Sequence, residues 1–199
     1  MNDRLKHLLI VLGLLCAVLL GYLVYTYTLH ADGWYCGPPE EGIARYAEVQ
    51  QENVQICQTQ QKDGFLYAVW EATATNKISM TILKQQKKLG RSYLRPWGAS
   101  PMGDGAVLDT YRHSEGDGAS KKSLVVVICD NRSGSLDHCN LTYITFLSDD
   151  IETRKETMGI TGPFLLHAQW LPGYVHCAAS VVDSQGNIVE QDGGYSGLE

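Results

Sequence analysis

A long uncharged run near the N-terminus is the strongest hydrophobic pattern in the chain. The run covers residues 8–29 and follows a short polar segment that contains Arg4 and Lys6. As an α-helix that rises about 1.5 Å per residue, it would span about 33 Å, which matches the hydrocarbon core of a bilayer. The pattern therefore predicts a single transmembrane helix over residues 8–29.

The same run could instead be a cleaved signal peptide, but two features argue against that alternative. The apolar core of a signal peptide is about 7–15 residues long and ends at small residues. Here the core is longer, and the best cleavage position, after Ala31, has the bulky Leu29 where a small residue is needed. We therefore expect a retained signal-anchor.

The charges that flank the run predict its orientation. Arg4 and Lys6 precede it, and no lysine or arginine follows until Arg45. Positive charge accumulates on the cytoplasmic side of a membrane helix. We therefore expect a cytoplasmic segment over residues 1–7, a single pass through the plasma (inner) membrane, and a C-terminal domain outside.

Beyond the anchor, short runs of alternating apolar and polar residues are typical of β-strands with one buried face. A linker over residues 30–42 and a short helix over 40–50 precede them. The expected strands cover residues 54–60, 65–74, 78–83, 124–128, 141–146, 164–170, 174–182 and 188–189. The pattern predicts a mainly β domain over residues 43–190, folded as an antiparallel β-sandwich or small barrel, and a flexible tail over 191–199.

Three segments between the strands carry more specific expectations. Residues 87–122 are dense in glycine, serine and charge, so a long loop is expected there. The strands at 124–128 and 141–146 are expected to pair as a β-hairpin, because a polar turn separates them. Asp149 and the glutamate three residues later resemble a capping box, which predicts a short helix that ends at Gly159.

The charge balance narrows the choice of partners. The whole chain carries a formal net charge of -6, from 16 basic and 22 acidic residues. Without Asp3, Arg4 and Lys6, 14 basic and 21 acidic residues remain, so the exported part carries about -7. A domain this acidic is repelled by nucleic acid, which argues against nucleic acid as its partner.

Five of the six cysteines follow the anchor, where an exported domain can keep disulfides. Cys129 ends one strand of the expected hairpin and Cys139 opens the other, so the two thiols would lie opposite each other and form a bridge. A second bridge between Cys36 and Cys57 is a further possibility. Cys177 shares a strand face with apolar residues and is expected in the core.

A stripe of small residues follows one side of the expected transmembrane helix. Gly13, Ala17 and Gly21 recur every four residues, so they stack on one helix face. Small residues at this spacing let two helix backbones approach closely. The stripe is therefore a candidate face for a homodimer, although glycine and alanine are also common in membrane helices.

A strip of basic residues is the main candidate binding site. No acidic residue occurs between Glu71 and Asp104, and Tyr93 lies among several cations. Such a strip could bind an anionic surface polymer, lipid headgroups or an acidic protein partner; the alternative is a solvated hairpin edge, where lysine discourages strand pairing. The predicted site comprises Lys84, Lys87, Lys88, Arg91, Tyr93 and Arg95.

Three segments resemble sites of catalytic chemistry, but none of them indicates a catalytic residue, a metal site or a cofactor. The segment from Trp34 to Pro38 resembles the thioredoxin motif, but Pro39 stands where that family has its second cysteine. His176 precedes Cys177, yet neighbours in a strand point to opposite faces. The polar residues 109–117 lack histidine or cysteine pairs at metal-ligand spacing.

These observations predict a membrane-anchored extracytoplasmic binding or assembly module rather than an enzyme. The alternative is a membrane-tethered extracytoplasmic hydrolase whose site lies in the expected loop over residues 96–122, with His113 as its candidate acid or base. The two differ in the residues that matter: the basic strip in the first case and His113 in the second.

Overall fold

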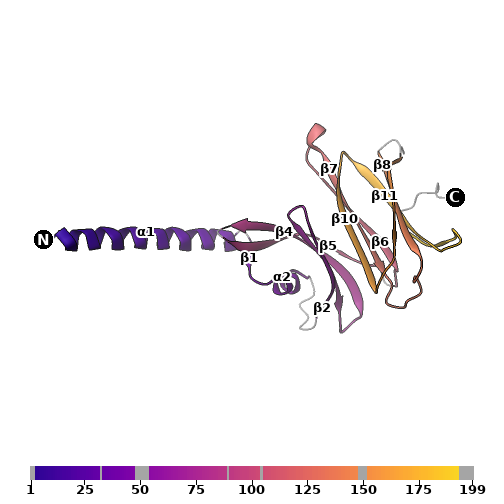
Figure 1. Cartoon of the computed structure of the whole chain (residues 1–199), viewed down its shortest axis with the longest axis horizontal. Coiled ribbons are helices and arrows are strands. Elements are labelled where there is room, and N and C mark those ends of the chain that lie inside the picture. The colour runs from indigo at the N-terminus through magenta and orange to yellow at the C-terminus, as the bar shows by residue number, and fades with distance from the viewer. Residues whose placement is uncertain are drawn as a thin grey trace.

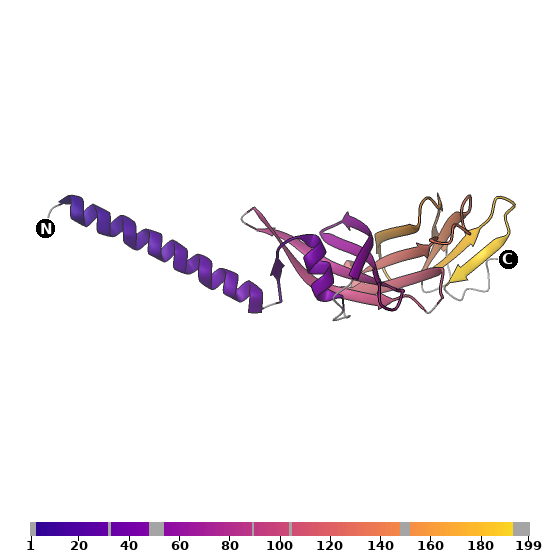
Figure 2. The ribbon, with the colours of Figure 1, turned by 90° about the horizontal axis from the view of Figure 1, so that it is seen from below.

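The computed structural model describes residues 3–31, 33–47, 54–88, 90–103, 105–147 and 152–192 of the chain. One long helix leads into a body of three antiparallel β-sheets (Figures 1 and 2). The fold is mainly β, as the alternating pattern predicted, and the sheets do not close into a barrel.

Helix α1 (Asp3–Ala31) contains the predicted apolar helix and extends it at both ends. Within it, the 24 residues of Arg4–Tyr27 are long and apolar enough to cross a membrane, and the body of the protein buries no residue of their most apolar stretch. A signal sequence has the same properties. Among the residues that the structure describes, α1 is therefore the one candidate membrane helix.

The small-residue stripe on α1 is open. A Cβ atom added at Gly13 or at Gly21 would meet no atom within 4 Å, and Ala17 is exposed. The stripe is therefore available to another helix, and the predicted dimer stays a prediction.

The strands form three sheets, which we name the first, middle and last sheet. The first sheet has the order β1-β5-β4-β3-β2, with bounds Tyr35–Cys36, Arg91–Pro101, Lys77–Lys88, Phe65–Ala72 and Val54–Lys62. The middle sheet has the order β10-β7-β6, with bounds Phe164–Pro172, Lys122–Asp130 and Leu108–Glu115. The last sheet has the order β12-β11-β8-β9, with bounds Ile188–Asp192, Val175–Val182, Asn140–Leu147 and Glu152–Gly159.

Strand β7 lies in the centre of the body, and both of its faces are buried. Each of residues 124–129 is at most 2% exposed. The even-numbered side chains pack against the first sheet and the odd-numbered ones against the last sheet. A strand covered on both faces requires a continuous apolar sequence, which Leu-Val-Val-Val-Ile supplies. The three sheets therefore form a stack with two cores (Figure 1).

Side chains of β2 cover the open edge of β10. The backbone N–H of Ala168 donates to Gln60 Oε1 at 3.1 Å, and Lys62 Nζ donates to the Ala168 carbonyl at 3.3 Å. An unpaired strand edge leaves backbone groups that need partners. These two contacts therefore satisfy both backbone groups of Ala168 and join the first sheet to the middle sheet.

Helix α2 (Pro39–Tyr46) covers the outer face of the first sheet. Its Ile43 is fully buried and packs with Leu66, Trp70 and Leu83. Proline at the start and two glutamates in the first turn suit a helix N-terminus. The predicted short helix is thus confirmed, with earlier bounds than expected.

The strands predicted at 124–128 and 141–146 exist, but they do not pair with each other. β7 belongs to the middle sheet and β8 to the last sheet. Asn131 holds the intervening corner: its Oδ1 accepts from the Leu136 N–H at 2.9 Å, and its Nδ2 donates to Asp137 at 2.9 Å. The predicted hairpin is wrong because these side-chain contacts stabilise a crossing between sheets.

Two other local predictions are wrong. Residues 87–122 contain the end of β4, all of β5 and β6, and a 3-10 turn, η1 (Gly118–Ser120), in place of a long loop. The segment predicted as a short helix contains β9, which pairs with β8 and carries two β-branched threonines that favour a strand. The expected helix start at Asp149 lies outside the described residues.

All six cysteines are free thiols in the structure, which corrects both predicted disulfides. Cys36 lies in β1 and Cys57 in β2, the two opposite edges of the first sheet. Cys129 and Cys139 are buried in the core between the middle and last sheets, but the corner after β7 replaces the hairpin that would have aligned them. Cys177 packs against the same core, as predicted.

Candidate functional site

The predicted basic strip lies on the β4–β5 hairpin, the longest strand pair in the protein. The two strands pair from Ser79↔Pro101 to Lys88↔Arg91. The far end of this hairpin extends past the other strands; in Figure 1 it overlaps the C-terminal end of α1, and in Figure 2 it reaches the same level along the long axis but stands to one side of the helix. The strip is thus held where the β body meets the helix.

Aromatic packing attaches the hairpin to α1. Tyr93, in β5, is 4% exposed and forms a small core with Trp34, against which Tyr25 of α1 and Cys36 pack. The side chains described along α1 are exposed except for Tyr22, Tyr25 and Thr26, which are half-buried. The last turns of the candidate membrane helix are therefore the part that the rest of the protein covers.

The cations of the strip face solvent. Lys84, Lys87, Arg91 and Arg95 are exposed, whereas Lys88 is placed only by its backbone in β4. Across the described part of the chain, no carboxylate forms an ion pair with any of these four exposed side chains. Their charge is therefore available to an external anion.

The strand register brings like charges together. Lys84 lies directly opposite Arg95, and Lys88 lies directly opposite Arg91. Like charges opposite each other in a sheet destabilise the pairing by several tenths of a kcal/mol. A bound anion would reduce this repulsion, so the register favours anion binding at the hairpin.

Tyr93 of the strip and the nearby Trp97 both have structural positions. Tyr93 is buried, so it positions the hairpin and does not reach a ligand. Trp97 lies farther along β5, where its ring centroid is 5.2 Å from that of Phe65 and 5.7 Å from that of Trp170. It closes the core between the first and middle sheets.

His113, the candidate residue of the hydrolase alternative, lies in β6. Its ring is exposed and stacks edge-on against Trp97, with the centroids 4.4 Å apart. The segment that was expected to be a catalytic loop is thus largely strand, and this histidine is an edge contact of an aromatic core. The hydrolase alternative stays an untested prediction.

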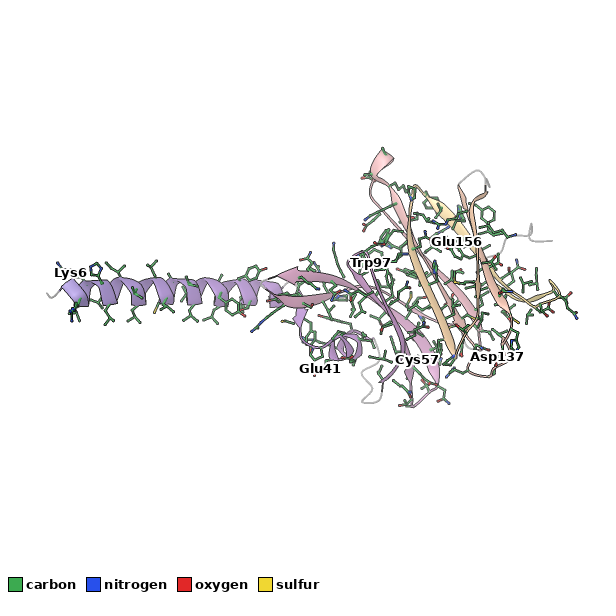
Figure 3. All side chains as sticks on the ribbon, viewed as in Figure 1. Lys6, Glu41, Cys57, Trp97, Asp137 and Glu156 are labelled. Carbon is green, nitrogen blue, oxygen red and sulfur yellow. The ribbon has the colours of Figure 1, made fainter. Side chains whose placement is uncertain are left out.

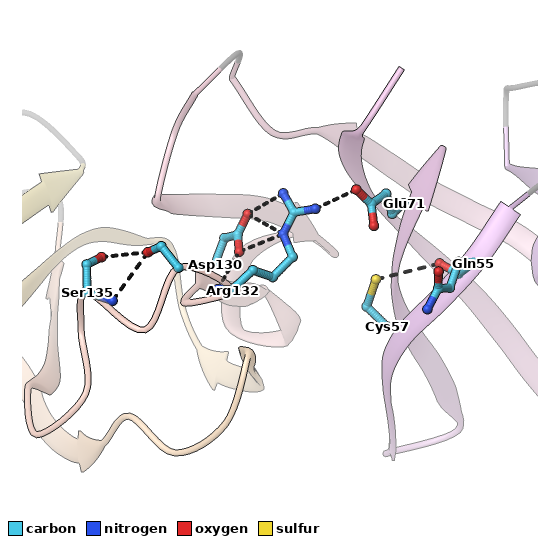
Figure 4. Close-up of polar contacts among 7 residues, drawn as sticks. Gln55, Cys57, Glu71, Asp130, Arg132 and Ser135 are labelled. Atoms are coloured by element: carbon cyan, nitrogen blue, oxygen red, sulfur yellow. Dashed lines mark hydrogen bonds and ion pairs between the residues drawn. The ribbon is translucent and has the colours of Figure 1, made fainter. Parts of the chain in front are cut away.

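Sequence analysis did not identify the interactions of Arg132. A cleft of about 660 Å³ lies where the β3–β4 turn, the β5–β6 connection and the end of β7 meet. On its wall, Arg132 donates to both carboxylate oxygens of Asp130 and, at 2.5 Å, to Glu71 (Figure 4). Because its guanidinium already has two carboxylate partners, the cleft does not offer an unpaired arginine to a ligand.

A second polar cluster lies between the middle and last sheets. The Tyr143 hydroxyl donates to Glu156 Oε2 at 2.6 Å, lies 3.1 Å from His167 Nε2, and accepts from the Gln169 amide at 2.6 Å. Arg154 forms an ion pair with Glu156. In Figure 3, Glu156 and Trp97 lie in the upper part of the β body, and Cys57 lies in the lower part.

Burial determines the ionisation behaviour of this cluster. Burial, followed by the hydrogen bond to Glu156, raises the pKa of the Tyr143 phenol. Burial also lowers the pKa of His167, although the nearby Glu156 carboxylate opposes that shift. A neutral phenol and a histidine that resists protonation suit a structural network that joins two sheets.

In the portion of the chain that the structure describes, no group of three or more histidine, cysteine, aspartate or glutamate residues is arranged to hold a metal ion.

Comparisons with protein-family models, curated proteins and solved structures gave no match. The case for a function therefore rests on the geometry of this chain.

Proposed function

We propose that the protein is a membrane-anchored extracytoplasmic binding module whose ligand-binding site is the β4–β5 hairpin. The observation that carries the proposal is the group of exposed cations, Lys84, Lys87, Arg91 and Arg95, that have no carboxylate partner within the described residues. An anionic ligand suits this hairpin although the exported part carries a net negative charge, because recognition depends on the local charge.

The proposed topology follows from charge and length. Arg4 and Lys6 precede the apolar helix, which favours a cytoplasmic N-terminus in the plasma (inner) membrane and a β body outside. Protease added to intact cells should then digest the β body and leave a short membrane fragment. Protection of the β body in intact cells would contradict this orientation.

Anion binding can be measured with the full chain in nanodiscs of neutral phosphatidylcholine. A fluorescent polyphosphate probe should bind the wild type, and the affinity should fall as salt is added. At about 1 kcal/mol per cation near an anionic surface, the double variant Lys87→Glu/Arg91→Glu should bind at least about 30-fold more weakly.

A matched substitution distinguishes binding at the hairpin from non-specific attraction by the net charge of the protein. Lys155, an exposed lysine in β9, lies in the last sheet, at the opposite side of the stack from the hairpin. Lys155→Glu changes the net charge as much as Lys87→Glu does, so it should leave probe affinity almost unchanged. Equal losses in the two single variants would show non-specific attraction and overturn the proposed site.

A further inference from the structure

We infer that the ligand of the hairpin is the anionic lipid headgroups of the bilayer that α1 crosses. This inference rests on the proposed function, because it assumes both the membrane helix and an anion-binding hairpin. It goes further by choosing one ligand among an anionic polymer, an acidic protein and a lipid surface. Three features of the structure favour the lipid.

The first feature is the position of the hairpin along the candidate membrane helix. Tyr25 packs on the Trp34–Tyr93 core, and the candidate span runs from Arg4 to Tyr27. The hairpin is thus attached to the last turns of the span and not to a linker beyond it. When α1 crosses a bilayer, these turns coincide with the headgroup region, where tyrosine and tryptophan are favoured.

The second feature is the direction of the charged face. Lys84↔Arg95 and Gln86↔Tyr93 are successive pairs two residues apart, so they share one face of the hairpin. Because Tyr93 contacts α1 on that face, Lys84 and Arg95 lie on the side turned toward the helix. Their long side chains can extend to phosphate groups around the helix while the backbone stays in the interface.

The third feature is that the position of the hairpin beside the membrane excludes soluble ligands. A soluble polymer or protein would have to enter the space beside the last turns of α1, which the bilayer occupies. Headgroups are present there at high local concentration, and anionic headgroups attract cations over about a Debye length. The position therefore favours lipid over a soluble anion.

The test uses the full chain in two kinds of nanodisc, one of phosphatidylcholine and one of phosphatidylcholine mixed with phosphatidylglycerol. A water-soluble amine-acetylating reagent labels exposed lysines, and mass spectrometry measures the labelling rate of each one. We expect Lys84, which shares the face of Tyr93, to react about three- to tenfold more slowly in the anionic discs. Lys122 and Lys155, exposed and in other sheets, serve as internal controls whose rates should not differ.

A variant establishes that the protection depends on charge. In Arg91→Glu/Arg95→Glu, the rate of Lys84 in anionic discs should return to its value in neutral discs, and high salt should do the same for the wild type. Lys155→Glu should keep the protection. An unchanged unfolding temperature shows that each variant is folded.

The possible outcomes separate this inference from the proposed function. If anionic discs give no added protection while polyphosphate still binds the wild type, the lipid assignment is overturned and a soluble anion becomes the ligand. Equal protection in neutral and anionic discs would also overturn it, because burial against lipid would then be independent of charge. Failure of both assays would overturn the anion-binding hairpin itself.

Discussion

Arg132, in the corner after β7, and Glu71, in β3, form a 2.5 Å ion pair that connects the middle and first sheets. The same guanidinium holds Asp130 at 2.7 Å. The side chains of Glu71 and Asp130 are only 17% and 15% exposed, so both carboxylates are partly desolvated. Arg132 therefore separates two carboxylates that would otherwise face each other across the boundary between sheets.

Replacement of Arg132 by alanine should destabilise the protein. The substitution leaves two half-buried carboxylates without their cation, which should lower the free energy of unfolding by about 2 kcal/mol. Arg132→Lys keeps the charge but loses the forked geometry, so its effect should be smaller. Urea unfolding of the full chain in detergent, followed by tryptophan fluorescence, measures both changes.

A double-mutant cycle with Glu71→Gln identifies the contact itself. If the ion pair carries the effect, the two substitutions together should cost at least about 0.5 kcal/mol less than the sum of the single effects. Lys155→Ala, which removes an exposed cation in another sheet, should change stability by no more than about 0.5 kcal/mol. Strict additivity would contradict the direct pairing.

His167 should make the protein less stable in mild acid. Burial lowers its pKa in the folded state below the ordinary 6.5, so the unfolded chain binds its proton first. Stability should therefore be full above about pH 7.5 and should fall as the pH drops through 6.5 toward the lower folded pKa. Thermal unfolding of the full chain between about pH 8 and pH 5 measures this dependence.

The variant His167→Gln separates this effect from other titrations. Its glutamine cannot be protonated, so stability should fall less steeply in the same pH range, whatever the absolute stability of the variant. His113→Gln removes an exposed histidine outside the Tyr143 cluster and serves as the control. An equal pH slope in wild type and His167→Gln would show that another group is responsible.

Local signals in the sequence predicted much of the fold. The turn at Asp63 and Gly64 joins β2 to β3, and both residues have positive φ angles, as a two-residue hairpin turn requires. Alternation likewise indicated the strands near residues 78–83 and 164–170. Such features depend on neighbours in the chain, which explains why composition and spacing were sufficient.

The predictions that failed depend on distant contacts. The corner at Asn131 is stabilised by partners up to 31 residues away, and nothing near β7 shows that it pairs with β6 and β10 instead of β8. The same holds for the site. Sequence gathered Lys84 and Arg95 into one strip, but the contact between Tyr93 and α1, which gives that strip its position, joins segments far apart in the chain.

The free thiols lead to a prediction about cysteine reactivity. Unfolded but unreduced protein should bind six maleimide groups, because the structure contains no disulfide. In the folded state, burial raises the pKa of Cys129 and of Cys177 to about 12, so both should react far more slowly at pH 8 than after unfolding. Mass spectrometry of labelled peptides counts the groups, and a count of four in the unfolded protein would indicate one bridge.

Tyr93 should control the position of the basic hairpin. Tyr93→Ala removes a ring that packs on Trp34 and Tyr25, and loss of an aromatic core contact of about 2–3 kcal/mol would increase local opening by about 30- to 150-fold. Hydrogen exchange of the full chain should therefore accelerate across residues 84–95 while β7 stays protected. Tyr93→Phe keeps the ring and should resemble the wild type. Unchanged exchange in Tyr93→Ala would mean that other contacts hold the hairpin. The position of its cations relative to α1 would then need a different explanation.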